Sequence, residues 1–155
     1  MEKAAVASIF DEYASLLELM GENPFKSRAY QNAARVVGAL DGDLDELVRA
    51  NKLVGTPGLG PTLLHDISEL VTTGHLQAYD DLKAKIPAGL QAMLRIPGLG
   101  PKRIKQIYDT LGVATITDLE QACQANKIAT LPGFGKKTQD NILRGIQFLS
   151  QHQDY

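Results

Sequence analysis

The sequence Ile-Pro-Gly-Leu-Gly-Pro-Lys-Arg-Ile at residues 96–104 contains a Pro-Gly-apolar-Gly tetrapeptide followed by a run with helical character. The tetrapeptide occurs again as Pro-Gly-Leu-Gly at residues 57–60 and as Pro-Gly-Phe-Gly at residues 132–135. The first glycines of successive copies are 40 and 35 residues apart. Repeats of this size indicate a repeated supersecondary unit. The sequence therefore predicts three copies of one helix–turn–helix unit.

Each part of the tetrapeptide has a physical role in such a turn. The proline ends the preceding helix, and the first glycine allows the positive φ of a tight reversal. The apolar residue is expected to face the core, and the second glycine to lie just before the next helix. In two copies a proline follows, which suits the first helical position. The apolar residues are Leu59, Leu99 and Phe134, and the glycines are Gly58, Gly60, Gly98, Gly100, Gly133 and Gly135.

A helix that begins directly after a glycine turn has free N–H groups at its positive dipole end. This geometry favours an anion, and a phosphate in particular. The second and third copies also carry cations in the first turns of the next helix: Lys102, Arg103, Lys105, Lys136 and Lys137. Two alternatives are a plain tight turn and ordinary solvated lysines. A dinucleotide-binding fingerprint and a P-loop are excluded because their glycine spacings do not occur.

Composition limits the other function classes. The chain has 155 residues, 44 % of them hydrophobic, and a net charge of −2. Residues 1–90 have a charge balance of −5 and residues 91–155 a balance of +3. One cysteine and three histidines exclude a disulfide framework and a cysteine-based zinc site, and we expect Cys123 in the core. No apolar run is long enough for a membrane span, so we expect a cytoplasmic protein, nucleoid-associated if bacterial.

Apolar spacing and capping residues predict an all-α fold without a β-sheet. We expect a capped short helix after Asp43 and a further capping box at Thr117. Two modules are expected, residues 1–85 with the first hairpin and residues 86–155 with the second and third. The predicted helices are Ala4–Met20, Pro24–Leu40, the short helix from Asp43, Pro61–Thr73, His75–Lys85, Ala88–Arg95, Pro101–Leu111, Thr117–Ala125 and Lys136–Gln151.

The sequence Gly-Glu-Asn-Pro-Phe-Lys-Ser-Arg-Ala-Tyr-Gln-Asn-Ala-Ala-Arg at residues 21–35, followed by the three repeats, resembles the N-terminal region of family X DNA polymerases. The bacterial members are the most similar. The resemblance implies a lyase-type domain with one helix-hairpin-helix motif and a DNA-binding subdomain with two more. It also implies that the polymerase palm would lie C-terminal to residue 150, so we expect a complete, stand-alone protein that does not polymerise DNA.

The same resemblance locates a lyase site. The position of the lysine that forms a Schiff base with an abasic sugar is Asp66, and a carboxylate cannot form an imine. We therefore expect no catalytic residue, with residual lyase chemistry at Lys26 as an alternative. Lys26 and Tyr30 match positions near a 5′-phosphate, and Arg28 and Arg35 lie on the same predicted helix.

The resemblance further implies a monovalent cation, Na⁺ or K⁺, bound by carbonyl groups of the hairpin turns. The matching carbonyls are those of Thr56, Leu59, Ile96, Leu99, Leu131 and Phe134. The overall expectation is a non-enzymatic protein that binds duplex, nicked or gapped DNA without sequence preference, in repair or recombination. A protein partner bound by the hairpin surfaces is the other alternative.

Overall fold

The computed structural model describes residues 1–152. Within this range every regular element is a helix and no strand occurs, which confirms the prediction of an all-α fold. The chain divides into two compact units, Met1–Lys85 and a second that begins at Ile86. No helix among the described residues is long and apolar enough to cross a membrane.

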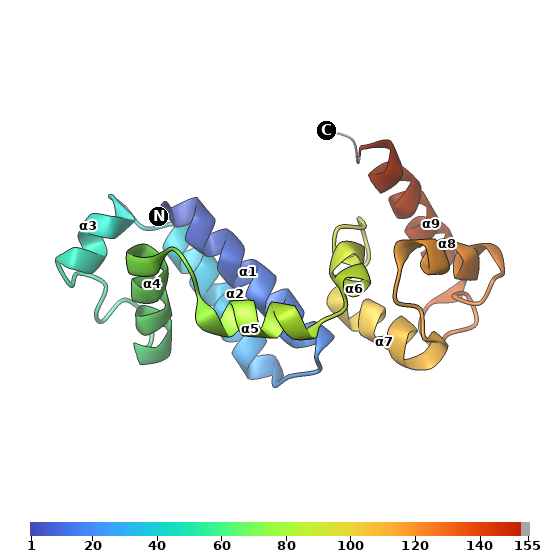
Figure 1. Cartoon of the computed structure of the whole chain (residues 1–155), viewed down its shortest axis with the longest axis horizontal. Coiled ribbons are helices and arrows are strands. Elements are labelled where there is room, and N and C mark those ends of the chain that lie inside the picture. The colour runs from blue at the N-terminus through green and yellow to red at the C-terminus, as the bar shows by residue number, and fades with distance from the viewer. Residues whose placement is uncertain (153–155) are drawn as a thin grey trace. The chain divides into compact units, whose positions relative to one another are not determined.

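The first unit is built on two long helices that lie side by side, α1 and α2 (Figure 1). Helix α5 also packs on α1, and α3 packs on α4 to form the first hairpin. The bounds are α1 Lys3–Leu19, α2 Pro24–Gly38, α3 Leu44–Arg49, α4 Pro61–Thr73 and α5 Gln77–Lys85. The prediction for α4 is confirmed at both ends.

Three aromatic rings fix α2 against α1 in the core of this unit. The ring of Tyr30 meets Phe10 and Tyr13 edge to face, with centroid distances of 5.4 and 4.7 Å. Edge-to-face pairs of this kind are favourable beyond the area that they bury. The side of α2 that carries Tyr30 is therefore held in place against the core.

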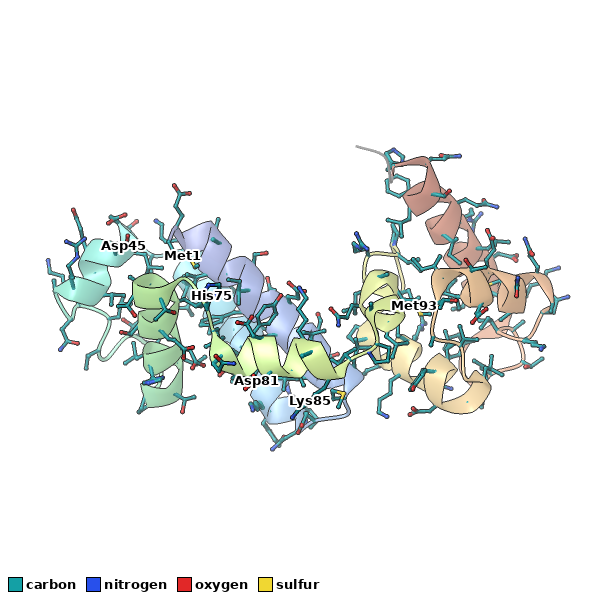
Figure 2. The ribbon with its side chains drawn as sticks, viewed as in Figure 1. Met1, Asp45, His75, Asp81, Lys85 and Met93 are labelled. Carbon is teal, nitrogen blue, oxygen red and sulfur yellow. The ribbon has the colours of Figure 1, made fainter. Side chains whose placement is uncertain are left out.

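The start of the chain is tied to α3. The N-terminal ammonium of Met1 donates a hydrogen bond to Oδ1 of Asp45 at 3.0 Å, and both residues are labelled in Figure 2. The Lys3 ammonium also donates to the carbonyl of Leu40 at 2.5 Å, in the loop before α3. These contacts position α3, the first helix of the first hairpin.

The second unit contains two further hairpins, α6–α7 and α8–α9. The bounds are α6 Ala88–Met93, α7 Pro101–Leu111, α8 Ile116–Gln124 and α9 Gly135–Gln151. Its core is made of large, fully buried side chains: Met93 (Figure 2), Ile96, Ile104, Ile107, Leu119 and Ile128. Cys123 is buried, as predicted, and burial raises the pKa of its thiol to about 11.

Two glycines of the second unit allow close backbone approach. A Cβ on Gly89 would lie 1.8 Å from the carbonyl oxygen of Ala114, so only glycine fits where α6 crosses the loop before α8. A Cβ on Gly145 would lie 2.7 Å from Cγ2 of Ile96 and 2.9 Å from the carbonyl oxygen of Pro97. Helix α9 therefore packs directly on the turn of the second hairpin.

Side-chain caps set several helix starts. The carboxylate of Asp43 accepts from the N–H of Glu46 at 3.2 Å, which confirms the predicted cap of α3. The capping box predicted at Thr117 is wrong. The cap is Thr115, whose hydroxyl accepts from the N–H of Asp118 at 3.1 Å. Its extended backbone is the conformation of an N-cap, and an acidic residue three positions later has the capping-box spacing.

The other predicted boundaries differ at some ends by one or two residues. Helix α5 begins at Gln77 instead of His75, because a carboxylate oxygen of Glu69 accepts from the N–H of Gln77 at 2.6 Å. Helix α2 ends at Gly38 and α6 at Met93, both before the predicted ends. After Met93 the chain turns through i to i−3 hydrogen bonds, such as Ile96 N–H to the Met93 carbonyl at 3.1 Å.

Candidate nucleic-acid interface

The three turns share one hydrogen-bond pattern. In each turn, the N–H of the apolar motif residue donates to the carbonyl of the residue three positions earlier. The N–H of that earlier residue in turn donates to the carbonyl three positions before it. The first set of bonds is Leu59 to Thr56 at 3.1 Å, Leu99 to Ile96 at 3.2 Å and Phe134 to Leu131 at 3.1 Å. The second set, each at 3.1 Å, is Thr56 to Leu53, Ile96 to Met93 and Leu131 to Ile128. The turns are therefore structural repeats as well as sequence repeats.

The first glycine of each turn has the positive φ that the motif predicts. The values are 91° for Gly58, 82° for Gly98 and 81° for Gly133. The next residue is buried in each copy, as expected, whereas all three glycines are exposed. The buried side chain holds the turn to the core, and the glycine backbone is left at the surface.

The second glycine differs among the three turns in its backbone conformation and in its position relative to the following helix. Gly60 and Gly100 are extended N-cap residues with ψ of −179° and 168°, as predicted. Gly135 has φ of 70° and is already the first residue of α9, so the prediction of a glycine before the helix is wrong there. A following proline forces the extended conformation, and the third copy has Lys136 in place of a proline.

The second helix of each hairpin begins without a side-chain cap. Asn23, Asp43 and Thr115 cap α2, α3 and α8, but no side chain caps α4, α7 or α9. The first N–H groups of a helix have no intrahelical partner and carry partial positive charge. At the three turns, no side chain of the described residues caps these N–H groups, so they are available to an anion.

The predicted cations of the second hairpin differ in their surroundings. Lys102 and Arg103 are exposed at the start of α7. Lys105 is only half-exposed, and its ammonium lies 2.7 Å from a carboxylate oxygen of Asp109. Arg103 lies over the ring of Phe134, 5.8 Å from its centroid, and so contacts the third turn. Of the three, Lys102 is the cation whose side chain makes no ion pair, hydrogen bond or ring contact with the described part of the chain.

The third turn is bound to the second hairpin by a further contact. The side-chain amide of Gln106 on α7 donates to the carbonyl of Pro132 at 3.1 Å. Lys136 and Lys137 are exposed at the start of α9. The second and third turns, with their cations, are thus held in one unit.

The four residues predicted for a 5′-phosphate pocket separate into two pairs. Lys26 and Tyr30 line a cavity of about 350 Å³, together with the N-cap Gly60 and the first three residues of α4. Arg28 and Arg35 do not line it. Arg28 lies roughly 200° around the helix from Lys26; it stacks over Phe25 at 4.9 Å and donates to the Pro24 carbonyl at 3.3 Å.

Asp66 is buried next to this cavity, with 8 % of its surface exposed. Its carboxylate accepts a hydrogen bond from the hydroxyl of Tyr30. Burial raises the pKa of Asp66, although the Tyr30 hydrogen bond and the Lys26 charge act in the opposite direction. Burial and the same carboxylate also raise the pKa of Tyr30. The position of the Schiff-base lysine is thus part of an internal contact between α2 and α4.

Two sets of groups are candidates for an ion. Ligand atoms of His65, Asp66 and Glu69 lie within 4.8 Å of one another, but both carboxylates already accept hydrogen bonds from the protein. The turn carbonyls of Thr56, Ile96 and Leu131 each accept one N–H, which leaves a second lone pair. The monovalent cation therefore stays a prediction.

The sequence-based reasoning missed two residues that shape the turns. Gln139 on α9 is buried; its side chain accepts from the Ala129 N–H at 2.8 Å and donates to Asn126 at 2.9 Å. It fixes the loop that enters the third turn. Asn32 on α2 lies against the first turn, where its Nδ2 is 2.8 Å from the position of a Cβ on Gly58. A glutamine and an asparagine at polar helix positions give no signal in a single sequence.

Comparison with known proteins agrees with this description. Residues 1–76 match a helix-hairpin-helix domain family, and residues 90–147 match a SAM-like helix-hairpin-helix tandem. The chain is 34 % identical over 146 residues to the DNA polymerase/3′-5′ exonuclease PolX of Bacillus subtilis (strain 168), covering 94 % of this chain and 25 % of that protein. A stretch of 53 residues is 42 % identical to a DNA ligase of Limosilactobacillus fermentum, covering 34 % of this chain and 8 % of the ligase.

These matches confirm the resemblance to the N-terminal region of a family X polymerase. The chain spans about a quarter of the length of the polymerase that it matches and less than a tenth of the ligase. The matched regions of this chain are helix-hairpin-helix domains.

Proposed function

With both units assigned to helix-hairpin-helix families, we propose that this chain binds DNA through the phosphate backbone, without sequence preference, as a repair or recombination factor. The observation that carries the proposal is the second turn. There the exposed Gly98 and Gly100 lead into the uncapped start of α7, beside the exposed cations Lys102 and Arg103. Gly133, Lys136 and Lys137 offer a related set at the third turn.

The chemistry of such a turn follows from the backbone. Cations in the first turn of a helix are unfavourable next to its positive dipole end, unless an anion lies there. A phosphate oxygen supplies that anion and accepts hydrogen bonds from backbone N–H groups and from the lysine. Because these contacts reach only the DNA backbone, they do not read base sequence.

Two finer parts belong to the same proposal. A Na⁺ or K⁺ ion would be held by the second lone pairs of the turn carbonyls and would bridge to a phosphate oxygen. The binding of nicked or gapped DNA in preference to intact duplex rests on the relatives, one a polymerase and the other a ligase by name.

We also propose that the first unit has no abasic-site lyase activity. Asp66 offers no amine, and its carboxylate is occupied by Tyr30. Lys26, which lines the adjacent cavity, is the alternative nucleophile. Borohydride trapping on DNA with an incised abasic site distinguishes the absence of lyase activity from lyase activity through Lys26. Lys26→Gln is the matched variant. We expect no trapped adduct; an adduct that is lost in Lys26→Gln would overturn this part.

The experiment that tests the function is a binding titration with intact, nicked, gapped and single-stranded DNA. Two unrelated sequences are used for each structure, at two salt concentrations. We expect equal affinity for the two sequences and a large loss of affinity at the higher salt. The absence of binding at low salt would contradict DNA binding and favour the protein-partner alternative.

A further inference from the structure

The first hairpin differs from the other two in its charge. Helix α4, which follows the first turn, contains no lysine or arginine, whereas α7 and α9 carry Lys102 and Lys136 as their second residues. The helix that follows the first turn therefore supplies no cation for a phosphate, and the basic residue of α3, Arg49, lies at the end of that helix, before the turn. The tertiary structure changes this, because a third helix lies on the turn.

That third helix is α2, and its contact with the first turn is close. A Cβ on Gly58 would lie 2.8 Å from Nδ2 of Asn32 and 3.0 Å from Cγ2 of Val36. The corresponding glycines of the other turns, Gly98 and Gly133, have nothing within 4 Å of such a Cβ. Among the three turns, only the first has a neighbouring helix this close to the first glycine of the motif.

Asn32 also orients a cation. Its side-chain oxygen accepts a hydrogen bond from Nη2 of Arg35 at 2.5 Å. The same amide group therefore contacts the turn through its nitrogen and holds the guanidinium through its oxygen. Arg35 is exposed, and this hydrogen bond uses one of the five N–H donors of a guanidinium.

We propose that Arg35 is the phosphate-binding cation of the first hairpin, supplied by α2 in place of the lysine that the other two hairpins carry in their own second helix. The ligand class is the phosphodiester backbone of DNA. Arg35 would form a charge-assisted hydrogen bond to a phosphate oxygen beside the Gly58 turn. This inference rests on the proposed function. Arg35 does not line the cavity of the predicted 5′-phosphate pocket, and the proposal assigns it to the first turn instead.

Arg35→Gln tests the proposal, because it removes the charge and keeps an amide. Arg28→Gln is the matched control, since it removes the same charge from the same helix at a residue that stacks on Phe25. Arg35→Lys restores the charge. Binding to nicked duplex DNA is titrated with the full chain over a range of salt concentrations, and thermal unfolding verifies that each variant folds.

We expect Arg35→Gln to make the negative slope of log K against log salt less steep by about 0.9, the value for one phosphate contact on duplex DNA. Arg35→Lys should regain this slope, and Arg28→Gln should keep it. An unchanged slope in Arg35→Gln, or an equal loss in both glutamine variants, would overturn the proposal. If the wild-type chain binds and depends on Lys102 and Lys136, such a result leaves the proposed function in place. If the wild-type chain does not bind, both fail.

Discussion

The hydroxyl of Tyr30 on α2 donates a hydrogen bond to the buried carboxylate of Asp66 on α4. In the resembling family, these positions correspond to a residue near a 5′-phosphate and to the Schiff-base lysine. Here they bind each other and join the two helices that flank the cavity next to the first turn. The pair therefore has a structural role in the first unit, and its removal should be measured as stability.

Tyr30→Phe removes the donor and leaves the Asp66 carboxylate buried without this partner. We expect a loss of about 1–3 kcal/mol in the free energy of unfolding, the usual cost of an unsatisfied buried polar group. Denaturant unfolding measures it. Tyr108→Phe is the control, because Tyr108 is exposed on α7 and should change stability little. Equal effects in the two variants would contradict the role of the hydrogen bond.

Asp66 should also make stability depend on pH. Its pKa in the folded chain is raised above the ordinary value of 3.8, so the folded state holds the proton more tightly than the unfolded state. The contribution of Asp66 to the free energy of unfolding is therefore complete below pH 3.8, and it is lost as the pH rises through the raised pKa. Compared with Asp66→Asn, the wild-type protein should lose stability over this range. Parallel pH profiles for the two proteins would contradict the raised pKa.

The glycine at residue 89 should not accept a side chain. In Gly89→Ala the new Cβ would meet the Ala114 carbonyl oxygen at 1.8 Å, so the backbone must move. We expect a loss of more than about 3 kcal/mol in unfolding free energy, in the range of severe packing errors. Gly38→Ala is the control, because open space surrounds that helical glycine. It should be neutral or stabilising by up to about 1 kcal/mol; a similar loss in both variants would disprove the close approach.

The two lysines of α7 should differ in their importance for DNA binding. Lys102→Gln should weaken binding about tenfold, since a hydrogen bond to a charged group contributes about 1.5 kcal/mol. Lys105→Gln should weaken it less, because Asp109 already offsets that charge at 2.7 Å. Parallel titrations of a fluorescent duplex measure both variants. A larger effect of Lys105→Gln would show that the ion pair opens on DNA.

The local chemistry of the turns could be predicted from the sequence. A positive φ at the first glycine and a buried next residue follow from the Pro-Gly-apolar-Gly pattern itself, and proline at residues 61 and 101 explains why Gly60 and Gly100 are extended. The third turn departs from the pattern at Gly135, where no proline follows. The sequence contained that difference, because Lys136 stands where the other copies have proline.

Contacts between elements could not be predicted in this way. The Tyr30–Asp66 hydrogen bond joins residues 36 positions apart, and the Gly58–Asn32 contact depends on how α2 lies on the first turn. Gln106 contacts the third turn from the second hairpin for a similar reason. A repeat pattern predicts each hairpin by itself, whereas the packing between hairpins and neighbouring helices decides which cation stands at which turn.

The most direct test of backbone binding by the turns is the salt dependence of DNA affinity in a charge-reversal variant. Lys102→Glu with Lys136→Glu is compared with Lys85→Glu with Arg144→Glu, which makes the same change in net charge outside the turns. We expect the first pair to make the negative slope of log K against log salt less steep by about 1.8, for two lost phosphate contacts, and to abolish binding near physiological salt. The control pair should weaken binding only moderately and keep the slope. Equal slopes and affinities in the two double variants would contradict phosphate binding at the hairpin turns.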